Sequence, residues 1–155
     1  MTADASSIHA SAVLVGAKAV LIRGPSGSGK SRLAWDLLSA AQHSTGFGAL
    51  PFARLVIDDR ALVEAHGGRL LVRPVPALAG IIEIYGLGIR QLPFEPVAAV
   101  GLVVDLAAGD ADRIPATAAE NTMISGVILP RLAIGAGIAP LPLVLASLKS
   151  IPAND

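Results

Sequence analysis

Short apolar runs separated by glycine, proline and charged residues recur along this chain and predict paired strands. Residues 11–15 and 19–22 are apolar and flank a tight turn at Gly16-Ala17-Lys18, which predicts a hairpin. Residues 61–64 and 69–72 flank Gly67-Gly68 and predict a second hairpin. Further strands are expected at 54–57, 81–85, 97–106 and 127–129.

Two stretches carry a helical signal. Apolar residues at helical spacing predict a helix of about three turns over 30–42. A proline-started stretch over 142–150 is expected to form a closing helix. The glycine-containing stretch 43–51 is expected to be a loop, and 107–122 a polar connector.

The composition indicates that these strands and helices belong to a layered domain. The chain has 155 residues, of which 53% are hydrophobic and 3% aromatic. Such a core must be built from Val, Leu, Ile and Ala, as in a sheet covered on its faces. We therefore expect a single α/β domain over residues 1–155.

Charge and cysteine content exclude several classes of partner and site. Twelve basic and twelve acidic residues give a formal net charge of zero, which removes the electrostatic case for a nucleic-acid partner. Cysteine is absent, so disulfides and thiolate metal sites are excluded. The uncharged stretch 132–148 is short and interrupted by two prolines, so no membrane span is expected. Without a recognisable secretory signal, a cytoplasmic location is expected.

A glycine-rich motif between a predicted strand and a predicted helix carries the clearest chemistry. Its glycines allow the backbone N–H groups to face phosphate oxygens, and the helix N-terminus adds a positive end. Lys30 supplies a charge for the phosphates, and the Ser31 hydroxyl is suited to Mg²⁺. The motif predicts a site for ATP or a related triphosphate. Its eight residues are Gly24, Pro25, Ser26, Gly27, Ser28, Gly29, Lys30 and Ser31.

Phosphoryl transfer also needs carboxylates near the phosphates, and two predicted strands end in them. One strand ends in Asp58-Asp59, and the other in Asp105. Adjacent residues of an extended segment point in opposite directions, so Asp58 and Asp59 can divide the metal and base roles. The pair is favoured over Asp105, although aspartate is also common at ordinary strand-end turns.

The chain resembles the catalytic domain of bacterial HPr kinase/phosphorylase. The resemblance is carried by His9, the glycine-rich motif, the sequence LVIDDR at 55–60 and the sequence EIYGLGI at 83–89. It extends over roughly residues 8–114, and the EIYGLGI segment separates it from other proteins with a phosphate loop. The resemblance implies a P-loop-containing kinase domain of the HPr kinase/PEP-carboxykinase type, in which helices flank a central mixed sheet.

The resemblance also implies roles for individual residues. Residues 24–31 would bind ATP, while Ser31 and Glu83 would hold Mg²⁺. Asp58 would accept the proton of the serine hydroxyl of the carrier protein HPr, and Asp59 would support it. His9 would assist near the phosphate, and Arg113 resembles a later catalytic arginine of the family. The implied function is an ATP-dependent serine kinase that regulates the phosphotransferase system and carbohydrate metabolism.

Several positions depart from the family pattern. Tyr85 stands where the family has arginine, and the interval between Lys30 and Asp58 is longer than usual. The family's regulatory N-terminal domain has no counterpart before His9. Its basic segment, linked to the phosphorylase reaction and to subunit contact, is matched only by the region around Arg131. We therefore expect kinase activity more firmly than phosphorylase activity or the hexamer typical of the family.

Two other functions remain compatible with the sequence. One is a small-molecule kinase or simple NTPase, which would need a closed pocket over its acceptor. The other is a non-catalytic nucleotide-sensing module, suggested by Tyr85 and the altered C-terminal segment.

Overall fold

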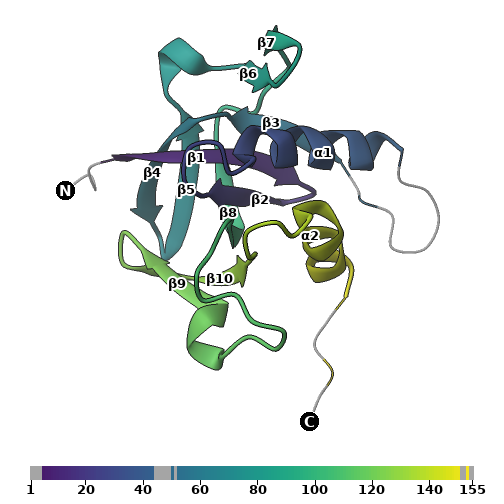
Figure 1. The fold of residues 1–155 in the computed structure, drawn as a ribbon. Coiled ribbons are helices and arrows are strands. Elements are labelled where there is room, and N and C mark those ends of the chain that lie inside the picture. Colours follow the sequence, from purple (N-terminus) through teal and green to yellow (C-terminus); the bar gives the residue numbers. More distant parts are fainter. Residues whose placement is uncertain (1–4, 44–49, 51, 151–152, 154–155) are drawn as a thin grey trace.

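The computed structural model describes residues 5–43, 50, 52–150 and 153. These residues form ten strands, two α-helices and two short 3-10 helices (Figure 1). In chain order they are β1 (Ser6–Val15), β2 (Lys18–Arg23), α1 (Lys30–Gln42), β3 (Ala53–Ile57), β4 (Arg60–His66), β5 (Arg69–Pro74), η1 (Pro76–Leu78), β6 (Ile81–Ile84), β7 (Gly88–Gln91), β8 (Ala98–Asp105), η2 (Thr117–Glu120), β9 (Asn121–Ile124), β10 (Val127–Ala133) and α2 (Pro140–Lys149).

Five strands close on themselves into a mixed β-barrel in the order β2-β1-β4-β5-β8. Four of the pairings are antiparallel, and a parallel pairing of β2 with β8 closes the ring. The turns of the two hairpins contain Gly16, Gly67 and Gly68 at positive φ, a conformation that glycine adopts without strain. Both hairpins predicted from the sequence are confirmed.

The barrel strands share one buried core. Small side chains suit the narrow interior of a five-stranded barrel, and alanine is frequent here. The barrel residues of this core are Ala10, Ala12, Ala19, Leu21, Ala61, Val63, Leu70, Val72, Ala98, Val100 and Val103. Outside it, β2 and β8 lie so close that a Cβ atom on Gly101 would meet the Lys18 Cβ atom at 2.8 Å.

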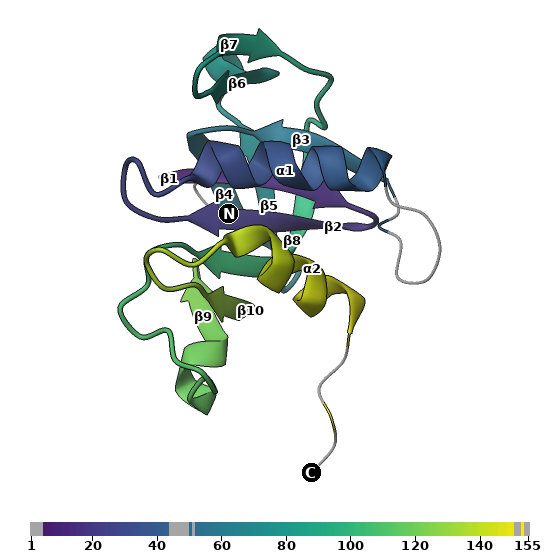
Figure 2. The same cartoon turned by 45° about the vertical axis from the view of Figure 1, so that its right-hand side comes forward.

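Both helices cover one side of the sheet, as Figure 2 shows. β2 and β8 are buried on two faces, because Val20 and Val104 point away from the barrel core and toward the helices. The helices contribute Leu33, Ala34 and Leu37 from α1 and Val144 from α2 to this second core. The predicted helix over 30–42 is confirmed, and the closing helix begins two residues earlier than expected.

The predicted fold class, an α/β P-loop kinase domain with helices flanking a central mixed sheet, is wrong. The structure is mostly β, with a closed five-strand mixed barrel and two α-helices among the described residues. Between β3 and β8 the described chain contains strands and a single 3-10 turn, so no crossover helix is available to cover the second face. That face is buried because the sheet curls and closes on itself.

The remaining strands extend the barrel at two ends. β3 pairs with β1, β10 runs parallel to β8, and β9 pairs with β10. β6 and β7 form a separate hairpin that projects beyond α1 at the top of Figure 1. Most of the predicted loop over 43–51 lies outside the described residues. No helix in the described part of the chain is long and apolar enough to cross a membrane.

Candidate functional site

The glycine-rich loop over 24–31 leaves the end of β2 and enters α1. Gly27 and Gly29 have φ values of 79° and 99°, which favour glycine, and Gly29 stands at the N-cap of the helix. A Cβ atom on Gly24 would lie 2.5 Å from Ser28 Oγ and 3.1 Å from Leu106 Cβ. The sequence of the loop therefore fits a tight path in which side chains at these glycines would be strained or crowded.

The start of α1 leaves polar groups of the loop facing outward. The first helical hydrogen bond joins the Leu33 N–H to the Gly29 carbonyl at 2.9 Å. The N–H groups of the preceding helical residues have no intrahelical partner, as at every helix N-terminus. Lys30 Nζ donates to the carbonyl oxygens of Gly24 at 2.9 Å and Pro25 at 3.2 Å. Within the described part of the chain, the loop thus combines N–H groups that lack an intrahelical partner with an ammonium group that two backbone carbonyls hold.

Asp58 lies beneath this loop, one residue after β3, and is only 4% exposed. Its Oδ1 atom accepts from Ser11 Oγ at 2.6 Å and from Ser31 Oγ at 2.7 Å. Its Oδ2 atom accepts from Ser31 Oγ at 2.8 Å and from the Glu83 N–H at 3.1 Å. These contacts join β1, α1, β3 and β6 at one buried carboxylate.

Asp59 is the exposed neighbour of Asp58 and adopts a left-handed conformation with φ of 71°. Its N–H donates to Ser11 Oγ at 3.2 Å, and its carbonyl accepts from the Ala10 N–H at 3.1 Å. Ser11 therefore binds both members of the acidic pair. The sequence analysis did not single out Ser11, although a hydroxyl between the apolar residues Ala10 and Ala12 of a strand signals a buried polar partner.

A cavity of about 610 Å³ opens between the loop, α1 and the β6–β7 hairpin. The described residues that line it are Ser26, Gly27, Gly29, Lys30, Ser31, Arg32, Trp35, Asp36, Asp59, Glu83, Ile84 and Tyr85. The structure thus brings together most of the predicted loop residues with Asp59 and Glu83. Asp58 lies behind the wall, in contact with Ser31.

His9 and Arg113 are predicted site residues that the structure places away from this cavity. His9 is exposed on β1, where it lies opposite Arg60 of β4, and it is not among the described lining residues. Arg113 is exposed in the connector after β8, and its backbone N–H donates to Asp112 Oδ1 at 2.7 Å. Among the described residues, neither side chain makes a hydrogen bond or ion pair with the loop or the acidic pair.

Asp105, the second candidate strand-end carboxylate, is held by arginines. Arg23 donates from Nε to Oδ1 at 2.7 Å and from Nη2 to Oδ2 at 2.8 Å, and Arg131 Nε also donates to Oδ2. Burial raises the pKa of the Asp105 carboxyl, but the hydrogen bonds and charges of the two arginines outweigh it and hold that pKa below its usual range. The Asp105 carboxylate therefore joins β2, β8 and β10 through its hydrogen bonds to these two arginines.

Arg131 continues the same network. Its two terminal nitrogens donate to Asp110 at 2.8 and 3.0 Å, and Nη1 also donates to the Ala119 carbonyl at 3.0 Å. Hydrogen bonds to Asp110 and then Asp105 raise the pKa of Arg131 above its ordinary value. We call Arg23, Asp105, Asp110 and Arg131 the arginine network.

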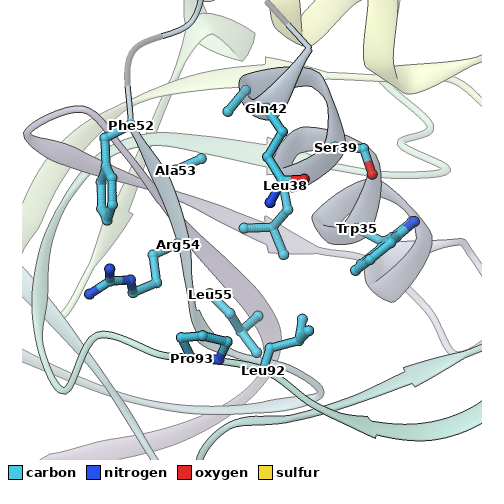
Figure 3. A pocket seen from close by; sticks show the side chains of 11 residues that line it. Trp35, Leu38, Ser39, Gln42, Phe52, Ala53, Arg54, Leu55, Leu92 and Pro93 are labelled. Atoms are coloured by element: carbon cyan, nitrogen blue, oxygen red, sulfur yellow. The ribbon is translucent and has the colours of Figure 1, made fainter.

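A second cavity, of about 430 Å³, lies along α1 beside β3 (Figure 3). Trp35 lines both cavities, and Phe52, Leu55 and Leu92 contribute apolar surface to this one. Its one ionisable side chain among the described lining residues is Arg54, which lies 4.7 Å from the Phe52 ring centroid and pairs with Glu95 at 2.9 Å. This cavity can hold an apolar group but presents no free acid or base.

The loop and its neighbours contain donors of the kind that Mg²⁺ prefers. Ser31 Oγ and the carboxylates of Asp58, Asp59 and Glu83 are hard oxygen donors at or behind the cavity wall. No group of three or more His, Cys, Asp or Glu in the described residues could hold a metal ion by itself. Mg²⁺ commonly binds one or two protein oxygens together with substrate phosphates and water, so the residues present fit a nucleotide-bound Mg²⁺.

Comparison with known proteins finds solved structures that share this fold. No family model and no curated protein matches the sequence. Among solved structures, the HPr(Ser) kinase/phosphatase from Coxiella burnetii matches with a TM-score of 0.70 and 23% identity. The match covers 92% of this chain and 93% of that chain. At this identity it shows a shared fold.

Proposed function

We propose that the chain is a single catalytic domain that transfers the γ-phosphoryl group of ATP to a serine of an HPr-like phosphocarrier. The observation that carries the proposal is the contact of Ser31 with Asp58 beside a cavity that also contains Lys30, Asp59 and Glu83. The fold shared with an HPr(Ser) kinase/phosphatase supports the same proposed function. The proposal implies a cytoplasmic location and a role in regulating carbohydrate metabolism through the phosphotransferase system.

The proposed chemistry divides among the residues around the loop. The loop N–H groups and Lys30 would hold the phosphates of ATP, because both are donors directed from a helix N-terminus. Ser31 and Glu83 would hold Mg²⁺, which neutralises charge on the transferred group. The acidic pair at 58–59 would supply the proton acceptor for the serine hydroxyl.

Two family features have no part in this proposal. Arg131, the nearest match to the basic segment linked to the phosphorylase reaction, already binds Asp105 and Asp110. We therefore propose the kinase direction and leave the phosphorylase direction and a hexameric assembly as predictions. His9 and Arg113 do not line the cavity, so the proposal does not depend on them.

The test is mass spectrometry of HPr after incubation with the protein, ATP and Mg²⁺. We expect one phosphoserine on HPr, and none on an HPr variant whose target serine is alanine. Calorimetry under the same conditions measures whether MgATP binds. Binding of MgATP without any modification of HPr would contradict the proposal.

Small-molecule phosphorylation is a second candidate, favoured by the volume of the cavity. A cavity of about 610 Å³ lies in the range that holds small ligands. Release of ADP that depends on a metabolite and not on HPr would support this candidate. A nucleotide-sensing module would instead bind MgATP without any release of ADP.

A further inference from the structure

The cavity beside the glycine-rich loop contains a hydroxyl group that the proposed transfer to HPr does not use. Tyr85 follows β6 at the turn of the β6–β7 hairpin and lines this cavity together with Lys30 and Ser31. We propose that Tyr85 is an internal phosphoryl acceptor, which receives the γ-phosphoryl group of an ATP bound to its own chain. This inference rests on the proposed function, whose site and ATP it shares, and adds a second acceptor to it.

Tyr85 is the hydroxyl on the wall that faces the loop. Three of the described lining residues have a hydroxyl group, and two of them, Ser26 and Ser31, belong to the loop itself. Ser31 Oγ already donates to Asp58 at 2.7 Å. Phosphoryl transfer requires an attacking oxygen roughly in line with the leaving oxygen, so the acceptor cannot come from the segment that holds the phosphates. The hairpin wall is the side from which an acceptor can approach.

The Tyr85 hydroxyl is free to act as an acceptor. The residue is fully exposed. Its side chain makes no hydrogen bond or ion pair with the described residues. A phenol hydroxyl has two oxygen lone pairs, and nothing in the described chain occupies those of Tyr85.

The hairpin that contains Tyr85 is anchored at its base and open at its tip. At the base, Ile82 is fully buried and the Glu83 N–H donates to Asp58 Oδ2 at 3.1 Å. Within the described chain β6 pairs only with β7, and the four residues of β7 are all exposed. A two-stranded ribbon with so few buried contacts opens at low free energy, so its tip can bring Tyr85 toward a bound phosphate.

The proposed step is a complete phosphoryl transfer. The phenol oxygen of Tyr85 forms a bond to the γ-phosphorus, and the bond from that phosphorus to the β–γ bridging oxygen breaks. The electron pair of the broken bond leaves with ADP. The phenol proton moves to the acidic pair at 58–59 and then to solvent.

Modification of Tyr85 would limit the activity of the site. A phosphorylated tyrosine adds a charge of about −1.5 to −2 at neutral pH. This charge would lie in the cavity that Asp59 and Glu83 also line, so negative charge would gather where the triphosphate must enter. We expect the modified protein to bind MgATP about fivefold or more weakly than the unmodified protein, as measured by calorimetry. Equal affinities would contradict this limiting role.

The experiment is mass spectrometry of the protein after incubation with ATP and Mg²⁺ without HPr. Tyr85 is the only tyrosine in the chain, so phosphotyrosine identifies the site without ambiguity. We expect one phosphate on Tyr85, none on Tyr85→Phe, and about 100-fold slower modification in Lys30→Ala. Leu87→Ala is the matched control, because Leu87 is another exposed residue of the same turn and its loss should change the modification rate by no more than about twofold.

Dilution separates transfer within one chain from transfer between chains. The modified fraction at a fixed time should stay constant over an about tenfold dilution of the protein, because the acceptor is tethered to the site. A fraction that falls with dilution would overturn the inference.

A parallel assay with HPr distinguishes failure of the inference from failure of the proposed function. Phosphorylated HPr with Tyr85 unmodified would overturn the inference while the proposed function stood. Phosphotyrosine without any transfer to HPr would support the inference and overturn HPr as the external acceptor. Binding of MgATP with transfer to neither acceptor would overturn both.

Discussion

Two carboxylates at the ends of buried strands have opposite surroundings in this molecule. Asp58 follows β3 and accepts hydrogen bonds from two hydroxyls and one backbone N–H. Asp105 ends β8 and accepts from the guanidinium groups of Arg23 and Arg131. Both positions look alike in the sequence, so the partners and not the strand-end position decide what each carboxylate can do.

The charge of the partners explains the difference. Neutral donors satisfy the oxygens of Asp58 without cancelling its negative charge, and that charge lies behind Ser31 at the cavity wall. Two arginines cancel the charge of Asp105 and fix it between three strands. The first arrangement suits a cation-bearing ligand, whereas the second suits the stability of the barrel.

The largest expected effect comes from removing the ammonium group on the Asp58 side. If the proposed function holds, Lys30→Ala should lower the rate of phosphoryl transfer by about 100-fold or more, because that proposal gives Lys30 the charge that stabilises the transferred group. The midpoint of thermal unfolding should change little, since the partners of Lys30 in the described structure are two loop carbonyls. A transfer assay and a melting curve on the same sample measure both. A large fall in the midpoint of thermal unfolding, alongside the loss of transfer activity, would contradict a purely functional role for Lys30.

The arginine network should respond in the opposite way. Arg131→Ala leaves Asp105 and Asp110 without a shared partner and should cost roughly 2–3 kcal/mol of the free energy of unfolding. MgATP binding to the remaining folded protein should be unchanged. Urea unfolding and calorimetry measure the two effects.

Arg32→Ala is the matched control for that substitution. Arg32 is 78% exposed and pairs only with Asp36 one helical turn away, so its loss should cost under about 1 kcal/mol. Equal losses of unfolding free energy in Arg131→Ala and Arg32→Ala would show that the arginine network stabilises the fold no more than a surface ion pair does.

The local parts of the fold could be predicted from sequence. The hairpins around Gly16 and Gly67-Gly68 and the helix over 30–42 depend on turn chemistry and spacing that a short segment contains. Barrel closure could not be predicted, because it depends on the pairing of β2 with β8, about eighty residues apart. The aliphatic composition suggested a sheet covered on its faces and the family resemblance suggested flanking helices, but neither contains information on barrel closure.

The same distinction between local and long-range features applies to the candidate site. Most of the loop residues that the motif predicted, together with Glu83, line one cavity. Ser11 could not be assigned, because its partners Asp58 and Asp59 lie 47 and 48 residues away. His9 and Arg113 were expected at the site from short matches, and the structure does not bring them to the cavity.

A smaller effect should appear in the pH dependence of stability. The folded-state pKa of Asp105 lies below its unfolded value of about 3.9, so its contribution is present above that value and is lost as pH falls through the folded pKa. The stability advantage of the unmodified protein over Asp105→Asn should therefore shrink below about pH 4, by up to about 1.4 kcal/mol per pH unit. Urea midpoints between neutral pH and pH 3 measure it. Parallel profiles for the two proteins would show that the arginines do not act through the Asp105 charge.

The smallest expected effect returns to the Asp58 side, in Ser11→Ala. The substitution removes a donor to Asp58 and the acceptor of the Asp59 N–H, but Asp58 keeps Ser31 and the Glu83 N–H. The loss should therefore be about 1 kcal/mol of the free energy of unfolding, less than for Arg131→Ala. Ser7→Ala, on an exposed position of the same strand, should cost almost nothing. If Ser11→Ala lost as much free energy of unfolding as Arg131→Ala, Asp58 would depend on Ser11 for its burial. The two carboxylates would then differ in the number of their partners rather than in the charge of those partners.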